Sequence, residues 1–425
     1  MDCRENDKEK VIIAGLHTGS RDYINDTTDE SMKELAELVD TAGGEVVGQM
    51  VQNRPMPDSG TYFGEGKLEE LKAATDALGA TLVVFDDELS PVQLRNINDI
   101  LGVRVLDRSM LILDIFAMRA RSGEGKLQVE LAQLKYQLPR LRGMGLELSR
   151  TGGGIGTRGP GETKLETDRR HIRTRIAALE EQIREIKKHR GLLRSRRSKD
   201  GVITAAIVGY TNAGKSTLLN RLTDAGIFAE DKLFATLDTT SRAITLDDNR
   251  KIILIDTVGF IRKLPHYLIE AFKSTLEEAA EADLLIHVTD AASPDADMHI
   301  TVVNNVLKDL GAQSKPVINV FNKCDIAPDF VPPATEGVNV FISARTGKGI
   351  DDLTDALYNT APGKKTERTF LIPYADGSVL NSLHSNEKVL SEEYTDTGVL
   401  VRVLVDDAVC GGLGKYLLTE CDNDV

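Results

Sequence analysis

The residues best suited to chemistry form a phosphate-binding pattern near the middle of the chain. Gly209, Lys215 and Ser216 occupy fixed positions of the pattern GxxxxGKS, which directly follows the apolar run 203–208. In a strand–loop–helix unit, the backbone N–H groups of such a loop face phosphates, the lysine reaches the β- and γ-phosphates, and the serine hydroxyl binds Mg²⁺. The loop residues expected to contact nucleotide are Gly209, Tyr210, Thr211, Asn212, Ala213, Gly214, Lys215, Ser216 and Thr217.

Three motifs further along the chain indicate that the nucleotide carries guanine. Each follows an apolar run that predicts a strand: DxxG, then NKxD, then a Ser-Ala-Arg segment. Asp256 would hold a magnesium-bound water, and the Gly259 N–H would contact the γ-phosphate. Asp325 can accept both N1–H and N2–H₂ of guanine, a donor pair that adenine lacks. The expected contacts from these motifs are Asp256, Thr257, Val258, Gly259, Asn322, Lys323, Cys324, Asp325, Ser343, Ala344 and Arg345.

The order of the motifs also locates two switch segments. A loop between the phosphate-binding loop and DxxG should fold over the γ-phosphate, and one threonine in it should complete the magnesium shell beside Ser216. Thr236 is our choice, and spacing alone does not separate it from Thr239 and Thr240. The loop residues expected at the nucleotide are Phe234, Ala235, Thr236, Leu237 and Asp238, and residues 259–266 form the second switch.

A catalytic glutamine is missing from the pattern. Phe260 follows Gly259, where many GTPases carry a glutamine that orients the attacking water. We therefore expect a GTP hydrolase that uses Lys215, Asp256 and Gly259, is slow alone, and is stimulated by a partner. Asn212 occupies the position found in GTPases that use K⁺ in place of an arginine, although it could equally serve only the loop's own hydrogen bonding.

Composition excludes several classes of protein. The 425 residues carry a net charge of −14, yet residues 119–199 hold 21 Lys and Arg against nine Asp and Glu. A basic block inside an acidic chain favours one face for a polyanion, although a solvated helical surface would look the same. The four cysteines lie far apart, no apolar run approaches the length of a membrane span, and the first residues are too acidic for a targeting segment. These features predict a cytoplasmic protein without membrane insertion.

Four units follow from the pattern of apolar residues. We expect an α/β domain with parallel pairing over residues 1–118, a basic helical hairpin over 119–199, a GTP-binding domain over 200–362, and a small α+β domain over 363–425. The GTP-binding domain should have the P-loop GTPase fold, a mostly parallel sheet with helices on both faces.

The basic block should form two antiparallel helices joined by a mobile tip. Leu127, Leu131, Leu134, Leu138 and Leu141 are spaced 4, 3, 4 and 3 residues apart, and Ile172, Ile176, Leu179, Ile183 and Ile186 repeat that spacing. Each set forms a narrow apolar stripe that must pack against another helix, and the glycine-rich segment 152–161 would join the two. Such a finger suits insertion into folded RNA, although a plain interdomain spacer fits the pattern too. The expected RNA contacts are Arg150, Arg158, Lys164, Arg169, Arg170 and Arg173.

Taken together, these motifs resemble the HflX family of ribosome-associated GTPases. The resemblance rests on the run from Gly152 to Arg170, followed by GYTNAGKST, FATLD, DTVGFI and NKCD, and it covers nearly the whole chain. It implies binding to the large ribosomal subunit and its RNA, splitting of stalled or heat-stressed ribosomes, and control of ribosome affinity by GTP. It also implies that Thr236 binds magnesium and that a hydrophobic residue at position 260 is normal. An ATP-dependent activity attributed to the N-terminal region of some relatives is not expected, because that region has no Walker-type motif.

Two alternatives stay open at this point. The first is a GTP-dependent RNA-binding or ribosome-assembly factor that does not split ribosomes. The second is a signalling switch that acts on proteins, with the hairpin as a structural part only. A monomer is expected.

Overall fold

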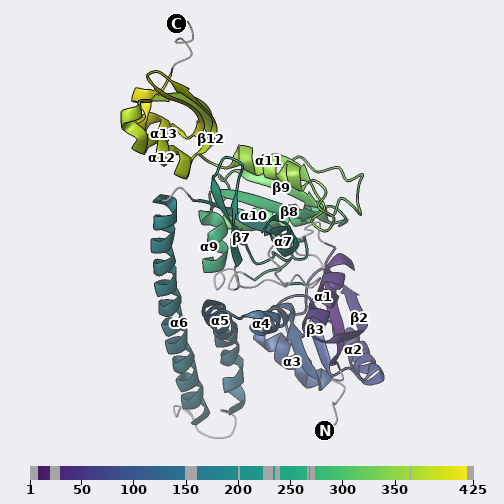
Figure 1. The fold of residues 1–425 in the computed structure, drawn as a ribbon. Helices are drawn as coiled ribbons and strands as arrows, with labels where there is room; N and C mark the ends of the chain where they lie inside the picture. The colour runs from purple at the N-terminus through teal and green to yellow at the C-terminus, as the bar shows by residue number, and fades with distance from the viewer. Residues whose placement is uncertain are drawn as a thin grey trace, which may run out of the picture.

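The computed structural model describes residues 8–19, 29–148, 160–199, 202–223, 233–234, 240–265, 268, 273–363 and 365–418. Four units are visible in Figure 1, from the purple N-terminal unit through the long blue-green helices and the green central unit to the yellow C-terminal unit. Within the described residues, no helix is both long enough and apolar enough to cross a bilayer.

The N-terminal unit is a parallel sheet covered by helices, as the alternating pattern predicts. Its strand order is β2-β1-β3-β4, and every pairing is parallel. The order reverses between β1 and β3, and open α/β sheets bind ligands beyond the strand ends at such a point. The elements are β1 (Lys10–His17), α1 (Asp29–Thr41), β2 (Glu45–Asn53), α2 (Glu65–Leu78), β3 (Leu82–Phe85), α3 (Pro91–Leu101), β4 (Arg104–Asp107) and α4 (Arg108–Arg119).

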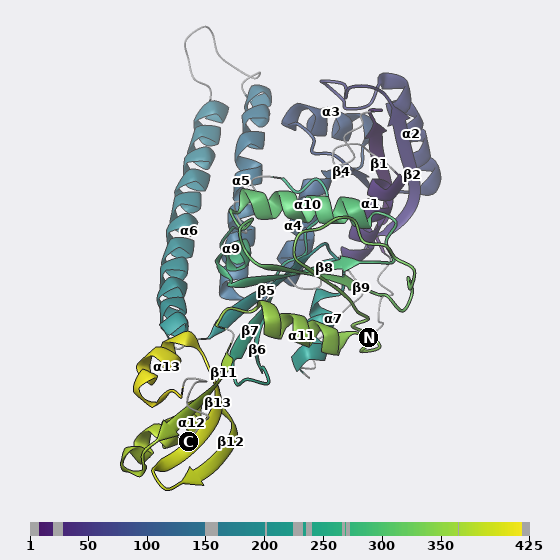
Figure 2. The ribbon, with the colours of Figure 1, turned by 90° about the horizontal axis from the view of Figure 1, so that it is seen from above.

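Two long helices form the predicted antiparallel hairpin. They are α5 (Gly123–Leu148) and α6 (Pro160–Lys199), and both Figure 1 and Figure 2 show them side by side. At 1.5 Å per residue, α6 is about 60 Å long. Leu131 and Leu179 are buried in the seam, and the other leucines and isoleucines of the two stripes are half-buried. The 4-3 spacing therefore marks the face along which the helices pack.

The central unit has the predicted P-loop GTPase architecture. Its sheet order is β10-β9-β8-β5-β7-β6, and only β6 runs antiparallel to its neighbour. The strands are β5 (Ile203–Gly209), β6 (Thr240–Thr245), β7 (Lys251–Asp256), β8 (Leu284–Asp290), β9 (Val317–Asn322) and β10 (Val338–Phe341). The helices are α7 (Lys215–Thr223), α9 (Lys273–Glu281), α10 (Ala296–Asp309) and α11 (Ile350–Thr360).

The two faces of the central sheet pack against different hydrophobic clusters. Residues of α7 and α11, such as Leu219 and Leu357, pack on one face. On the other face, α9 and α10 share one continuous cluster with α1, α4 and α5, in which Leu276, Phe116 and Tyr136 are all buried. Apolar packing therefore joins the central unit to the N-terminal unit and to the base of the hairpin.

The C-terminal unit is a small antiparallel sheet with short helices, as predicted. Its order is β11-β13-β12, and Figure 2 shows it next to the C-terminal end of α6. The elements are β11 (Thr366–Ile372), α12 (Gly377–Asn386), β12 (Lys388–Thr395), β13 (Gly398–Val405) and α13 (Asp407–Gly412), with 3₁₀ turns η1 (Tyr374–Asp376) and η2 (Gly414–Tyr416).

Candidate nucleotide site

The phosphate-binding loop joins the buried strand β5 to α7. Gly209 ends the strand, and a Cβ atom there would lie 2.2 Å from the Val288 carbonyl oxygen. Gly214 has a φ of +93°, and a Cβ atom there would lie 2.2 Å from the Asn322 amide. Both positions therefore require glycine, which explains the two fixed glycines of the motif in steric terms.

The Lys215 side chain curls back over this loop. Its Nζ donates to the carbonyl oxygens of Gly209, at 3.2 Å, and Tyr210, at 2.8 Å. Burial lowers the pKa of Lys215 to about 8, an effect that the nearby Asp256 carboxylate opposes. A phosphate placed beside this buried ammonium would favour its charged form further.

Oxygen atoms suited to magnesium lie beside the loop. The Ser216 hydroxyl, on the first turn of α7, donates to Asp256 Oδ2 at 2.7 Å, and Asp256 is the last residue of β7. Hydroxyl and carboxylate oxygens are the ligands that Mg²⁺ prefers, so these residues fit the ion. The next residue, Thr257, instead bonds the Ile207 carbonyl oxygen at 2.7 Å, which ties DxxG to β5.

The guanine motifs meet at the carboxyl ends of β9 and β10. Asn322 donates from Nδ2 to the Ala213 carbonyl oxygen at 2.8 Å and accepts from the Ala344 N–H at 2.9 Å, so one side chain joins all three loops. Lys323 pairs with Asp290 at 2.7 Å. Asp325 is exposed at the end of this group, where a base could reach it.

The remaining members of these motifs have structural contacts. The Cys324 thiol donates to the Phe321 carbonyl oxygen, Ser343 Oγ accepts from the Thr346 N–H, and the Arg345 carbonyl oxygen accepts from Arg221. Val258 is buried, Thr217 is half-buried, and Thr211 is buried, whereas Asn212 is exposed with a positive φ.

The first switch is described only at its start. Phe234 is buried, with its ring centroid 4.7 Å from that of Phe116 on α4, so its side chain belongs to the core between the units. Ala235, Thr236, Leu237 and Asp238 lie outside the described residues, and so does Thr239. The choice of Thr236 for magnesium therefore stays a prediction.

The Phe260 side chain is buried in the hydrophobic core. Only 1% of the residue is exposed, and it belongs to the core cluster that also holds Tyr210 and Leu276. Its backbone pairs with the phosphate-binding loop, since its N–H donates to the Gly209 carbonyl oxygen and its own carbonyl oxygen accepts from the Thr211 N–H. The residue after DxxG is thus part of the hydrophobic core.

Sequence reasoning missed a cluster of charges between the second switch and the N-terminal unit. Lys263 Nζ lies 2.6 Å from Asp86 Oδ2 and 2.6 Å from Asp87 Oδ1, and both acids directly follow β3. The Tyr210 hydroxyl donates to Glu34 Oε2 at 2.7 Å and accepts from the Arg262 N–H at 2.8 Å. The two adjacent acids that directly follow a buried parallel strand, Asp86 and Asp87, were the feature of the sequence that could have indicated this cluster.

A second arginine balances these acids inside the N-terminal unit. Arg108 is 1% exposed, lies 2.7 Å from Asp86 and also pairs with Glu34. Although burial opposes it, the charges of Arg108 and then Lys263 hold the pKa of Asp86 below its ordinary value. Burial raises the pKa of Glu34 in spite of the same arginine.

The predicted RNA contacts divide by position along the hairpin. Arg170 and Arg173 are exposed on α6 and have no ion-pair partner among the described residues, and Arg169 is half-buried. Arg150 and Arg158 lie outside the described residues, as does the side chain of Lys164.

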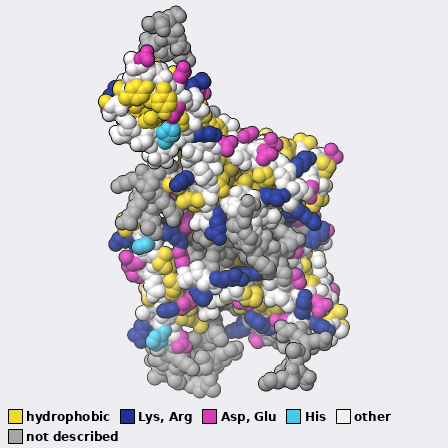
Figure 3. Space-filling model, in the orientation of Figure 1, with side chains coloured by type: hydrophobic (Ala, Val, Ile, Leu, Met, Phe, Trp, Pro, Cys, Tyr) yellow, Lys and Arg dark blue, Asp and Glu magenta, His cyan; other side chains and the backbone are white. Residues whose placement is uncertain are grey.

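Basic residues nearer the base of the hairpin are used within the protein. Arg175 pairs with Glu130 at 2.6 Å, and Lys135 pairs with Glu180 at 2.9 Å. On the face shown in Figure 3, basic, acidic and hydrophobic side chains are interspersed along these helices. Part of the basic block therefore holds the hairpin together.

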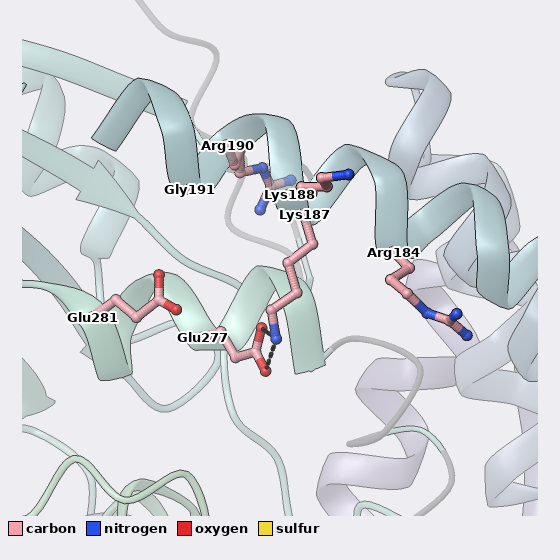
Figure 4. A pocket seen from close by; sticks show the side chains of 7 residues that line it. All are labelled: Arg184, Lys187, Lys188, Arg190, Gly191, Glu277 and Glu281. Atoms are coloured by element: carbon pink, nitrogen blue, oxygen red, sulfur yellow. Dashed lines mark hydrogen bonds and ion pairs between the residues drawn. The ribbon is translucent and has the colours of Figure 1, made fainter. Parts of the chain in front are cut away.

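The base of α6 also contacts the helix that follows the second switch. Lys187 on α6 lies 2.6 Å from Glu277 on α9, beside a cavity of about 310 Å³. Figure 4 shows the lysine side chain reaching across to this acid. Arg190 adds ion pairs to Glu278, at 3.2 Å, and to Glu124 on α5. These contacts tie the hairpin to the nucleotide-binding unit.

The chain is similar to known proteins over nearly its whole length. Three family models match, described as GTP-binding GTPase N-terminal over residues 29–117, GTP-binding GTPase middle region over 119–197, and 50S ribosome-binding GTPase over 204–323. GTPase HflX of Caldanaerobacter subterraneus subsp. tengcongensis is 50% identical over 421 residues, covering 98% of this chain and 96% of the relative. GTPase HflX of Escherichia coli is 44% identical over 407 residues, or 94% of each chain. Among solved structures, one titled "crystal structure of SsGBP and GDP complex" is 26% identical with a TM-score of 0.45, covering 83% of this chain and 98% of that one.

Proposed function

Because the chain belongs to the HflX family of GTPases and is a GTP hydrolase, we propose that it binds the large ribosomal subunit and dissociates stalled or stress-damaged ribosomes, with GTP controlling its affinity. The observation that carries this proposal is similarity to HflX GTPases over 98% of the chain, hairpin included. The family model that matches the central unit, described as a 50S ribosome-binding GTPase, supports the same partner.

For the hydrolytic step, we propose that water attacks the γ-phosphate in line. Lys215 and the Gly259 N–H would stabilise the charge that develops on the phosphate oxygens. Ser216 and Thr236 would hold Mg²⁺, with Asp256 on a bound water, and the ion would supply positive charge at the same place. The Ser216–Asp256 hydrogen bond of 2.7 Å supports this assignment because it brings both side chains to one point.

The missing glutamine is the reason for proposing an activator. Since the Phe260 ring is buried and carries no polar atom, it cannot orient water. A partner that positions the water or stabilises the transition state typically raises the rate of GTP hydrolysis by about 10³–10⁵. The ribosome is the proposed source.

Potassium is a second proposed aid to hydrolysis. Asn212 is exposed at the phosphate-binding loop and adopts a φ of 59°. If it helps to hold K⁺ against the phosphates, turnover in KCl should exceed turnover in NaCl at equal ionic strength, as measured by phosphate release. Equal rates in the two salts would show that Asn212 serves only the loop.

The hairpin is the proposed RNA-binding element. Exposure of Arg170 and Arg173 at the tip-side part of α6 supports this, and we extend the proposal to Arg150, Arg158, Lys164 and Arg169. Phosphate contacts of this kind release counterions, so ribosome affinity should fall steeply with salt. We also propose that the domain boundaries lie at residues 118, 199 and 362, and that the protein is a cytoplasmic monomer.

Ribosome splitting is tested by mixing intact ribosomes with the full chain and a non-hydrolysable GTP analogue. The proposal predicts free subunits on a sucrose gradient, and none when GDP replaces the analogue. If the protein instead migrates with undissociated ribosomes, the alternative of a GTP-dependent RNA-binding or assembly factor replaces splitting. A Lys215→Ala chain is the matched control, because it should lose the triphosphate-dependent effect while keeping the hairpin.

A further inference from the structure

One buried hydroxyl in the phosphate-binding loop lacks a hydrogen-bond partner. Thr211 is only 6% exposed, and its Oγ1 atom bonds no group among the described residues. No other serine or threonine in the part of the chain that the structure describes has a buried hydroxyl oxygen without a partner. A hydroxyl can donate one hydrogen bond and accept two, and leaving them unmade in the protein interior costs free energy.

Buried threonines elsewhere in the chain bond a neighbouring backbone group. Thr75 on α2 donates to the Leu71 carbonyl oxygen at 2.7 Å, and Thr257 donates to the Ile207 carbonyl oxygen at the same distance. Most buried polar groups in folded proteins are paired in this way. Thr211 departs from that rule, and because valine has nearly the same shape, packing alone does not account for a hydroxyl at this position.

Thr211 lies against the two groups that are expected to bind the γ-phosphate. A Cβ atom built on Gly259 would lie 2.8 Å from Thr211 Cγ2, 2.9 Å from Thr211 Cα and 2.9 Å from Lys215 Nζ. In P-loop GTPases, the lysine of the loop and the N–H of the DxxG glycine both contact the γ-phosphate. A γ-phosphate bound by these two groups is therefore beside the Thr211 side chain.

Backbone hydrogen bonds hold this part of the loop in place. The Thr211 N–H donates to the Phe260 carbonyl oxygen at 2.8 Å, and the Phe260 N–H donates to the Gly209 carbonyl oxygen at 3.1 Å. Threonine is branched at Cβ, which restricts rotation about χ1. A hydroxyl restricted in this way loses little entropy when it binds a reactant, as preorganised catalytic groups require.

From these observations we propose that the Thr211 hydroxyl holds the attacking water against the γ-phosphate, in place of the glutamine that the chain lacks at position 260. Oγ1 accepts a hydrogen bond from the water, and its own O–H donates to a γ-phosphate oxygen. The substrate and the water thus supply the donor and the acceptor that the hydroxyl lacks within the described chain. The inference rests on the GTP site proposed above and is independent of the ribosome.

Thr211 acts in this step by position alone. The water oxygen forms a bond to the γ-phosphorus while the bond from that phosphorus to the bridging oxygen breaks, and the electron pair of the broken bond stays on GDP. The proton that the water loses passes to a γ-phosphate oxygen and leaves with inorganic phosphate, so Thr211 keeps its own proton. A single hydroxyl orients water less firmly than a carboxamide, which has separate donor and acceptor atoms, so hydrolysis by the chain alone is slow.

The test compares single-turnover phosphate release by full-length chains at saturating GTP, without ribosomes. Thr211→Val removes the hydroxyl and keeps the shape, so the rate should fall roughly 10- to 100-fold, the loss expected for one hydrogen bond to a charged group. Thr211→Ser keeps the hydroxyl and should stay within about threefold of the wild-type rate. Affinity for GDP, measured by calorimetry, should change less than about twofold in both variants, because Thr211 acts at the γ-phosphate.

Stability without nucleotide gives a second readout. Because Oγ1 has no partner among the described residues, Thr211→Val should leave the midpoint of chemical denaturation unchanged or raise it. Thr75→Val is the matched control, since it removes a buried but hydrogen-bonded hydroxyl from the N-terminal unit. This control should lower the midpoint and leave GTP hydrolysis unchanged.

Three results would overturn the proposal. The first is a wild-type rate of hydrolysis in Thr211→Val, and the second is a serine variant as slow as the valine variant. The third is a lower denaturation midpoint in Thr211→Val, which would show that the hydroxyl already has a partner in the folded chain. If the wild-type chain bound neither GDP nor GTP, the site itself would be wrong, whereas normal GDP binding with equal rates in the wild type and Thr211→Val refutes the inference alone.

Discussion

Phe260 illustrates how a residue can be essential to the site without taking part in the chemistry. The sequence places it where other GTPases have glutamine, and the structure buries its ring in the core shared by the phosphate-binding loop, α9 and the N-terminal unit. Its backbone, by contrast, touches the loop directly. The side chain therefore anchors the second switch, and restoring glutamine would not restore the function that glutamine has elsewhere.

Replacing this ring tests that interpretation. Phe260→Gln would bury an amide without partners and lose aromatic packing, so the free energy of unfolding should fall by about 2 kcal/mol or more. GTP turnover of the folded fraction should not rise. Chemical denaturation and phosphate release measure the two effects, and Phe260→Leu is the apolar control. A glutamine variant that hydrolysed GTP tenfold faster would contradict the buried role.

His299, which stacks on Tyr210, predicts an acid sensitivity. Burial, assisted by the Arg262 charge, lowers the pKa of His299 from 6.5 to about 4. Between these values the unfolded chain takes up a proton that the folded chain does not, so stability falls as the pH drops from 6.5 towards 4, by at most about 1.4 kcal/mol per pH unit. His299→Phe keeps the stacking and removes the titration, so its unfolding free energy should depend less steeply on pH over this window. Identical slopes for both chains would show that His299 does not contribute.

At the scale of elements, the basic residues of the hairpin form two groups: some are ion-paired within the protein, and others are exposed. Arg175 and Lys135 pair with acids across the α5–α6 seam, while Arg170 and Arg173 are exposed nearer the tip. Net charge alone cannot distinguish these groups, because pairing depends on which side chains face each other across two helices. The exposed pair is the better candidate for RNA.

Neutralising the exposed pair should weaken ribosome binding. Arg170→Gln with Arg173→Gln removes two charges from the proposed RNA surface, so the affinity for large subunits should fall and its dependence on salt should become shallower by about two counterions. The matched control, Lys135→Gln with Arg175→Gln, removes two charges from the same helices but at internal ion pairs. If both double variants bound ribosomes like the wild type, the signalling-switch alternative, in which the hairpin is structural, would be favoured.

Most of the elements could be predicted from the sequence, because each leaves a local signal. The apolar runs before GxxxxGKS, DxxG and NKxD became β5, β7 and β9, and the 4-3 spacing of leucines and isoleucines became the α5–α6 seam. The adjacent acids Asp86 and Asp87 were visible in the sequence, but their contact with Lys263 was not, since Lys263 lies 177 and 176 residues away from them and follows a strand of another sheet. The roles assigned to the site residues remain predictions that the geometry supports.

At the scale of the whole molecule, the nucleotide-binding unit contacts both the N-terminal unit and the helical hairpin. The second switch contacts the N-terminal unit through Lys263, and α9 contacts the hairpin base through Lys187 and Arg190. The hydrophobic cluster shared by α1, α4, α5, α9 and α10 makes these parts one packed body. A change in the second switch can therefore alter how the N-terminal unit and the hairpin are presented to a partner.

Control of ribosome binding by GTP can be measured by sedimenting the purified full-length chain with large ribosomal subunits, in parallel with a non-hydrolysable GTP analogue and with GDP. The chain should pellet with the subunits in the analogue state and stay largely in the supernatant with GDP. Equal pelleting in the two states, or no pelleting in either, would contradict the claim that guanine triphosphate controls the binding of this protein to ribosomal RNA.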